Sequence, residues 1–380
     1  MSYAPAPMRA VRSVPHRSAA GREPVGVSID ASATRCRRLP LMVVVPVLLV
    51  VLVVAMAVDA SVGDGGVGVL NAVRVVGHHV AGFVVPAHFG AVQDQIVWQL
   101  RMPRVLLGAV VGAGLAVVGT TLQAVVRNPL ADPYVLGVSS GAGFVVAATI
   151  TLGSAAVAGL STSSAGFLGA LITTVLVLGI ARGGGRFDPT RVVLAGVTLS
   201  YLFAGATSFL IFMSSVPNAA RAVLFWMLGS LGRAQWSTLG LPVAAVLPGT
   251  AYLLVQARAL DALVVGEETA LSVGVNVRRL RAQLLVVTAL VTGVMVAVAG
   301  GIGFVGLIIP HIVRQVVGPN HRRVLPVAAL VGAIYLVAVD TVCRVAASPA
   351  ELPIGIVTSV LGAPYFLWLL HRAQPREVGR

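Results

Sequence analysis

Ten long apolar runs constrain this chain more than any other feature. Most of them have the roughly 17–25 residues that an α-helix needs to cross a bilayer. In hydrocarbon, such a segment has to satisfy its own backbone hydrogen bonds, which favours helices. The sequence therefore predicts an all-α membrane protein with about ten transmembrane helices. The runs are Leu41–Val58, Val105–Val126, Tyr134–Leu152, Ala165–Ala181, Val192–Met213, Leu239–Val255, Ala282–Gly300, Val305–Val317, Val324–Cys343 and Ile354–Leu370.

Three of these runs need separate interpretation. Leu41–Val58 follows an Arg-rich segment, so a secretory signal peptide is the alternative to a first span. The run is longer than a usual signal-peptide core, and Asp59 interrupts the region where cleavage would occur, so we favour a span. Val305–Val317 is short and follows a Gly-rich stretch, which indicates a broken helix. Pro353 and Pro364 interrupt the last run, and discontinuous spans of this kind are common in transporters.

The arginines predict the orientation of the chain. All 27 basic residues are Arg, against 13 acidic residues, which gives a net charge of +14. With a cytoplasmic N-terminus and ten crossings, 21 arginines fall on the inner side and six on the outer side. Cytoplasmic loops accumulate positive charge, so this split predicts that both termini are cytoplasmic. The charge therefore reflects topology rather than nucleic-acid binding, because 57% of the residues are hydrophobic.

The same patterns divide the chain into three parts. Residues 1–39 are rich in Arg, Ser, Pro and Ala and predict a disordered cytoplasmic tail. Residues 40–372 form the membrane domain, and residues 373–380 form a second cytoplasmic tail. Between the first two spans, Leu70–Val85 carries Arg74, His78 and His79 and fits a helix in the membrane interface better than a span.

Small residues recur at three- or four-residue spacing in and beside the predicted spans. Such spacing lets helix backbones approach closely in lipid, so we expect tight helix packing at these glycines. The stretches 106–123 and 287–303 are both rich in small and β-branched residues. They would cross the membrane in opposite directions, which is compatible with inverted-topology repeats. The glycine groups are Gly108 and Gly112, Gly137 and Gly141, and Gly300, Gly303 and Gly306.

Catalytic chemistry is sparse in this sequence. There is no HExxH, no GxSxG and no Cys/His cluster, so neither an intramembrane enzyme nor a metal site is supported. Without lysine the chain has no P-loop, so ATP and Mg would bind to another chain and no cofactor is expected here. Asp340 is the one carboxylate inside a predicted span, with Arg344 four residues on; a local ion pair and a functional role both stay open. An ion-coupled secondary transporter would depend on Asp340 or His311.

The segment from 258 to 281 predicts two short amphipathic helices on the inner side. Leu260, Leu263 and Val264 have i, i+3, i+4 spacing, and Glu267 and Glu268 follow Gly266 like the first turn of a second helix. Such helices need a cover for their apolar faces, which is either a partner protein or the lipid interface.

Several stretches resemble the permease subunits of the iron-siderophore and vitamin B12 class of ATP-binding-cassette (ABC) importers. They occur in the same order along residues 98–372, which makes the resemblance specific. The stretches are Trp98–Arg104, Arg127–Gly143, Leu194–Val197, Phe225–Leu231, Gly266–Gly274, Gly303–His311, Glu351–Thr358 and Leu361–Trp368.

The resemblance implies a transport subunit rather than an enzyme, in the cytoplasmic membrane. Two permeases, either identical or paralogous, would pair around a central path. They would dock two cytoplasmic ATPases, and a soluble extracytoplasmic binding protein would deliver the substrate. In the loop 258–281, Glu267, Glu268 and Gly274 would contact the ATPase. Arg101, Arg104 and Arg344 would meet acidic residues of the binding protein, steering its docking.

The resemblance also suggests an inner gate and a cargo. The gate would lie at Pro189 and Thr190. From the residues themselves, we expect a mildly polar path lined by Ser, Thr and Gly of the fifth and tenth spans, with these hydroxyl residues: Thr198, Ser200, Thr207, Ser208, Thr358 and Ser359. We expect a ferric siderophore as cargo, with cobalamin or haem as the alternatives.

Overall fold

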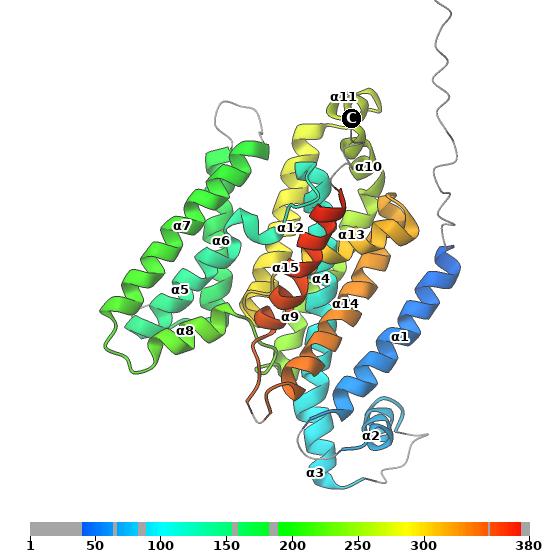
Figure 1. Ribbon diagram of the computed structural model, residues 1–380, viewed down its shortest axis with the longest axis vertical. Helices are drawn as coiled ribbons and strands as arrows, with labels where there is room; N and C mark the ends of the chain where they lie inside the picture. The colour runs from blue at the N-terminus through cyan, green and yellow to red at the C-terminus, as the bar shows by residue number, and fades with distance from the viewer. Residues whose placement is uncertain are drawn as a thin grey trace, which may run out of the picture. The chain divides into compact units, whose positions relative to one another are not determined.

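The computed structural model describes residues 40–63, 67–82, 89–153, 159–181, 189–348 and 350–373, and the described residues are dominated by helices (Figure 1). The predicted tails, residues 1–39 and most of 373–380, lie outside them. The helices are α1 (Leu41–Ser61), α2 (Val69–Ala81), α3 (Ala91–Asp94), the π-helix η1 (Gln95–Arg101), α4 (Met102–Val126), the 3₁₀-helix η2 (Pro133–Leu136), α5 (Val138–Leu152), α6 (Thr162–Ala181), α7 (Pro189–Met213), α8 (Ala219–Met227), α9 (Trp236–Val255), α10 (Ala257–Val265), α11 (Glu267–Ser272), α12 (Val277–Ala299), α13 (Val305–Val317), α14 (His321–Val345) and α15 (Ile354–Ala373).

Each of the ten apolar runs forms a helix. Seven of the resulting helical stretches are long and apolar enough to cross a membrane, and α5, α13 and α15 are shorter apolar helices at the other three runs. The all-α membrane fold is therefore confirmed. The predicted interfacial helix is also present as α2, although residues 83–85 of that prediction lie outside the described residues.

One boundary and one helix differ from the sequence prediction. The second span was expected to begin at Val105, yet the helix is continuous from Ala91 through η1 into α4. Arg101 and Arg104 interrupt the apolar run in the sequence, but both side chains are buried and paired, so the helix continues through them. Helix α8, between α7 and α9, was not predicted.

The described helices place two groups of short elements at opposite ends of the bundle. Helices α10 and α11 lie at the end where α15 finishes, which we call the loop end (Figure 1). Helices α2, α3 and α8 lie at the other end, which we call the arginine end. Helices α4 and α12 pack against each other and run in opposite directions, as expected, although a repeat relation between them stays a prediction.

Helix α4 is the centre of the packing, and glycines allow its close contacts. It packs against α9, α12, α13 and α14. A Cβ added to Gly112 would lie 2.2 Å from the carbonyl oxygen of Gly332 in α14, and one added to Gly119 would lie 2.1 Å from that of Gly306 in α13. These helices touch through their backbones, so the close packing expected at Gly112 and Gly306 is confirmed.

We expect Gly119→Ala to lower the stability of the purified protein by about 1–3 kcal/mol, because the new methyl group would overlap the backbone of Gly306. The matched control is Gly240→Ala in α9, where an added Cβ meets nothing within 4 Å. Thermal unfolding in detergent measures both variants. Equal melting temperatures for the two would contradict the close approach of α4 and α13.

The break predicted before α13 is present. Helix α12 ends at Ala299, and Phe304, with φ of 68°, precedes the first residue of α13. Backbone hydrogen bonds connect this irregular region with two other segments. Ser230 N–H donates to the carbonyl of Ala299 over 2.8 Å, and Gly355 N–H donates to that of Leu228 over 2.8 Å. The connection before α9, the break before α13 and the start of α15 are thereby joined, as non-helical backbone within a membrane requires.

Candidate functional site

Three arginines singled out in the sequence come together at the arginine end. Arg101 is the last residue of η1, Arg104 lies in the first turn of α4, and Arg344 lies in the last turn of α14. The π-helical turn is fixed by an aromatic stack: the ring of Trp98 lies 4.1 Å from that of His79 and 4.7 Å from that of Trp236. Such local π-helices often occur at functional sites.

Arg104 is held by two carboxylates. Its Nε donates to Asp340 Oδ2 over 2.8 Å and its Nη2 to Asp340 Oδ1 over 2.9 Å, which is a bidentate pair. Its Nη1 donates to Glu351 Oε1 over 2.7 Å. Asp340 is 1% exposed, whereas the Glu351 side chain is 47% exposed. Arg104 therefore joins a buried acid of α14 to an accessible acid in the segment before α15.

Arg344 and Arg101 attach the end of α1 to the same cluster. Arg344 pairs with the carboxylate of Asp59 and donates to the carbonyl of Val62 over 2.8 Å. Arg101 Nη1 donates to the carbonyls of Ala60 and Ser61, both over 2.9 Å. Asp59 is completely buried. The first span is thus fixed to η1 and α14 through charged contacts at its last turn.

The cluster surrounds an open cavity of about 350 Å³. Three arginines and three carboxylates balance in charge, and of those carboxylates only Glu351 lines the cavity. An incoming acidic group would meet all three guanidinium groups there. The lining residues are Gly63, Ile96, Leu100, Arg101, Arg104, Gly232, Ala234, Arg344 and Glu351.

Sequence reasoning found the arginines but only part of their pairing. The Asp340–Arg344 ion pair is present at 3.4 Å, but the stronger partner of Asp340 is Arg104. Asp59 and Glu351 were not identified as partners. The signals for them were weak, since Asp59 marks the end of an apolar run and Glu351 only opens one of the family-like stretches.

At the loop end, α10 and α11 form the two short helices that the sequence predicts. Leu260 and Leu263 are fully buried, so one face of α10 packs inward. Val264, expected on that face, is instead 49% exposed. The predicted loop was too long at its end, because Arg278 and Arg281 already belong to α12.

Two polar side-chain contacts attach this loop to the bundle. Asp261 Oδ1 of α10 lies 2.6 Å from His321 Nδ1 and also accepts the backbone N–H of His321 at the start of α14. Glu267 Oε2 of α11 lies 3.3 Å from Arg281 Nη1 of α12. Glu268 is exposed in the same first turn. Through these two contacts, a displacement of the loop would move the starts of α12 and α14.

Three exposed apolar side chains lie on the surface of the loop. Val265, Leu271 and Val273 are 74%, 57% and 65% exposed. Val265 is the last residue of α10, Leu271 lies in α11, and Val273 directly follows α11. The next residue, Gly274, has a φ of 81°, in the left-handed region that glycine adopts without strain. We call these three residues the loop tip. Exposed apolar side chains in such a group are typical of a protein contact.

The residues predicted to line a path lie on two helices with different neighbours. Helix α7 packs against α5 and α6, whereas α15 packs against α13 and α14. Among these residues, Thr190, Thr198, Ser208 and Ser359 are exposed, Ser200 is half-buried, and Thr207 and Thr358 are buried. Pro189 is the first residue of α7. The structure therefore does not bring the two groups together on one pair of packed helices.

Comparisons with known proteins agree with this architecture. The family model described as the FecCD transport family matches residues 47–372. The cobalamin import system permease protein BtuC of Halobacterium salinarum is 44% identical over 298 residues, covering 78% of this chain and 79% of that protein. The hemin transport system permease protein HmuU of Yersinia pestis is 42% identical over 287 residues, covering 74% of this chain and 85% of that protein.

A solved structure shares the fold over nearly its whole length. It is a metal-chelate type ABC transporter in an inward-facing conformation, with a TM-score of 0.73 and 31% sequence identity. The match covers 87% of this chain and 99% of that chain.

Proposed function

Because the chain belongs to the FecCD transport family and is the multi-pass permease of an ABC importer in the cell membrane, we propose that it moves a metal chelate inward. The observation that carries this proposal is the separation of two contact surfaces. The arginine cavity lies at one end of the bundle and the loop tip at the other. In the proposed orientation the loop end and both termini are cytoplasmic, as the arginine distribution predicts.

The arginine cavity is the proposed docking site for an extracytoplasmic binding protein. Its three guanidinium groups would pair with acidic side chains of the partner, and charge complementarity of this kind orients association. Glu351 is the carboxylate that a docking acid would replace, because Asp59 and Asp340 are buried. The segment that carries Glu351 leads directly into α15. Release of Glu351 from Arg104 would therefore allow the start of α15, a helix of the proposed path, to move.

This exchange predicts that Glu351→Gln tightens docking. Removing the internal competitor leaves the cavity with one excess positive charge, and we expect about a fivefold gain in affinity that declines with added salt, equivalent to about 1 kcal/mol. Binding is measured between the permease complex in nanodiscs and the binding protein that co-purifies with it. Glu268→Gln at the loop end is the control and should not change the affinity. Weaker or unchanged docking of Glu351→Gln would rule out the exchange.

The loop tip is the proposed contact with the ATPase. ATP hydrolysis takes place on that separate chain, because this chain has no P-loop lysine. Glu267, Glu268 and Gly274 lie beside the tip and would border the ATPase cleft. The contacts of Asp261 with His321 and of Glu267 with Arg281 would pass movement of the ATPases to α14 and α12.

The path is proposed to form between two permease copies or between this chain and a paralogue. The exposed Thr198 and Ser208 of α7 and Ser359 of α15 provide hydroxyl groups that a single copy leaves uncovered. A second permease would bring the two helices onto a shared interior, with Pro189 and Thr190 proposed at its cytoplasmic gate.

The cargo class rests on the relatives and on the solved neighbour, which are named for cobalamin, hemin and metal chelates. A ferric siderophore, expected from the resemblance, stays a prediction with cobalamin and haem as alternatives. Uptake of labelled iron-siderophore, haemin or cobalamin into proteoliposomes holding the complete importer tests this choice. Saturable uptake of one chelate that the other two do not inhibit supports the proposal. Uptake of none of them, in liposomes whose binding protein docks, would contradict a metal-chelate cargo.

A further inference from the structure

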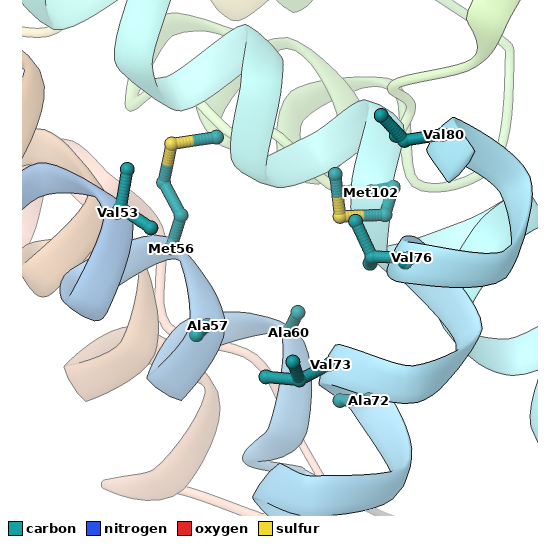
Figure 2. A pocket seen from close by; sticks show the side chains of 10 residues that line it. Val53, Met56, Ala57, Ala60, Ala72, Val73, Val76, Val80 and Met102 are labelled. Carbon is teal, nitrogen blue, oxygen red and sulfur yellow. The ribbon is translucent and has the colours of Figure 1, made fainter. Parts of the chain in front are cut away.

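An apolar cavity of about 330 Å³ lies where α1, α2 and the start of α4 meet (Figure 2). It is separate from the arginine cavity, and the proposed transport cycle does not use it. All of its lining side chains are apolar. They are Val53, Met56, Ala57 and Ala60 of α1, Ala72, Val73, Val76, Gly77 and Val80 of α2, and Met102 of α4.

Small residues on two facing helix stripes create the space. The four residues from α1 recur at i, i+3, i+4 and i+7, so they form one face of that helix. Ala57, Ala60, Ala72 and Gly77 have little or no side chain to fill the gap between α1 and α2. In Figure 2, Val53 and Met56 stand on one side of the space and Val76, Val80 and Met102 on the other.

The cavity opens onto an exposed apolar surface of the bundle. Val53, Val73 and Val80 at its rim are 64%, 49% and 73% exposed. They continue the exposed apolar surface of α1, which has the highest mean hydropathy of the membrane-length helices, 3.3, and only 6% of its span window buried. The mouth is therefore continuous with the face that α1 presents to the bilayer.

The position along α1 fixes the depth of the cavity. Val53 is eight residues before the end of α1 at Ser61, or about 12 Å at a rise of 1.5 Å per residue. The cavity thus lies beneath the end of the span, in the acyl region of one leaflet. Helix α2, which forms its other wall, is amphipathic and carries the exposed Arg74, as is typical of a helix at the headgroup level.

We propose that this cavity binds one acyl chain of a phospholipid from the leaflet at the arginine end. An empty apolar space deprives its lining atoms of van der Waals contacts, and water would find no polar partner there. Hydrocarbon is the fluid at this depth, so an acyl chain restores these contacts. Association in lipid depends on packing of this kind rather than on the hydrophobic effect. The bound chain would then support the contact of α2 with α1 next to the arginine cluster.

The test is to fill the cavity and count the lipids that the protein retains. The permease complex is released from nanodiscs of palmitoyl-oleoyl phosphatidylglycerol, and its bound lipids are counted by native mass spectrometry. We expect Ala57→Phe to retain one phospholipid fewer per permease than the unchanged protein. Val50→Phe is the matched control, because Val50 is 64% exposed on α1 and does not line the cavity. This control should retain the full number.

A second variant and a second measurement keep the outcome decisive. Val73→Trp obstructs the mouth from α2, and the fraction of immobilised spin-labelled phosphatidylglycerol should fall in both cavity variants but not in Val50→Phe. Unchanged lipid retention in two folded cavity variants would overturn the proposal. Replacement of the missing lipid by a protein chain in the native mass spectrum would also overturn it, since the occupant would then be a partner segment.

Discussion

Replacing Arg104 with methionine is expected to cost about 3–5 kcal/mol of stability, the usual loss when a buried ion pair is broken from one side. The change leaves Asp340, which is 1% exposed, without the two hydrogen bonds of 2.8 and 2.9 Å that hold its carboxylate. A loss of this size is a large share of the roughly 5–15 kcal/mol that keeps a typical domain folded. Fluorescence-detected gel filtration after heating measures the loss.

Two further variants identify the ion pair as the cause. Arg104→Met combined with Asp340→Leu should recover most of the stability, because an apolar pair can replace a buried ion pair at little cost. Arg221→Met, which removes an exposed arginine stacked on Phe225, should lose less than about 1 kcal/mol. A double variant as unstable as Arg104→Met would show that the loss has another origin.

Replacing Val265 with glutamate is expected to abolish transport by preventing ATPase docking. The side chain is 74% exposed at the loop tip, and a contact there would bury it. An unpaired charge buried at the centre of an interface costs more than about 2 kcal/mol, which corresponds to at least a thirtyfold loss of affinity. ATPase association is measured by co-elution from mild detergent, and transport by ATP-driven uptake.

The control for this change lies at the opposite end of the chain's fold. Val216, in the connection between α7 and α8, is 42% exposed, and Val216→Glu should leave ATPase association unchanged. A Val265→Glu variant that still co-elutes with the ATPase would show that the partner contacts another surface.

The spans were predictable because hydrophobic length alone determines what can cross a bilayer. The start of α4 was not, because hydropathy treats Arg101 and Arg104 as a boundary, whereas their buried contacts allow the helix to continue. Helix α8 was missed because its nine residues are too few to form a span. The glycine contacts followed from the spacing of small residues, but their partners in α13 and α14 did not.

The arginines of the candidate site could be predicted from the sequence, but most of their ion-pair partners could not. Resemblance identified Arg104 and Arg344, and i, i+4 spacing identified the pair of Asp340 with Arg344. The bond from Arg104 to Asp340 joins positions 236 residues apart, and that from Arg344 to Asp59 joins positions 285 apart. No local pattern encodes contacts of that range; they depend on how α1, α4 and α14 pack.

The residues predicted to line a path do not come together within one copy. Thr198 and Ser208 lie on α7 and Ser359 on α15, and these helices pack against different neighbours. Sequence reasoning treated them as one lining because they are polar residues in apolar spans. In the proposed path, these residues would meet only when a second permease packs against this one.

The most direct test of the account is energy-dependent uptake by the reconstituted complex. Proteoliposomes containing this permease and its co-purified ATPase, with the binding protein outside and ATP inside, should accumulate the labelled chelate. Accumulation should stop when ATP is replaced by a non-hydrolysable analogue, and proton or sodium gradients should not restore it. Accumulation driven by an ion gradient without ATP, and lost on substitution of Asp340 or His311, would contradict the account and indicate a secondary transporter.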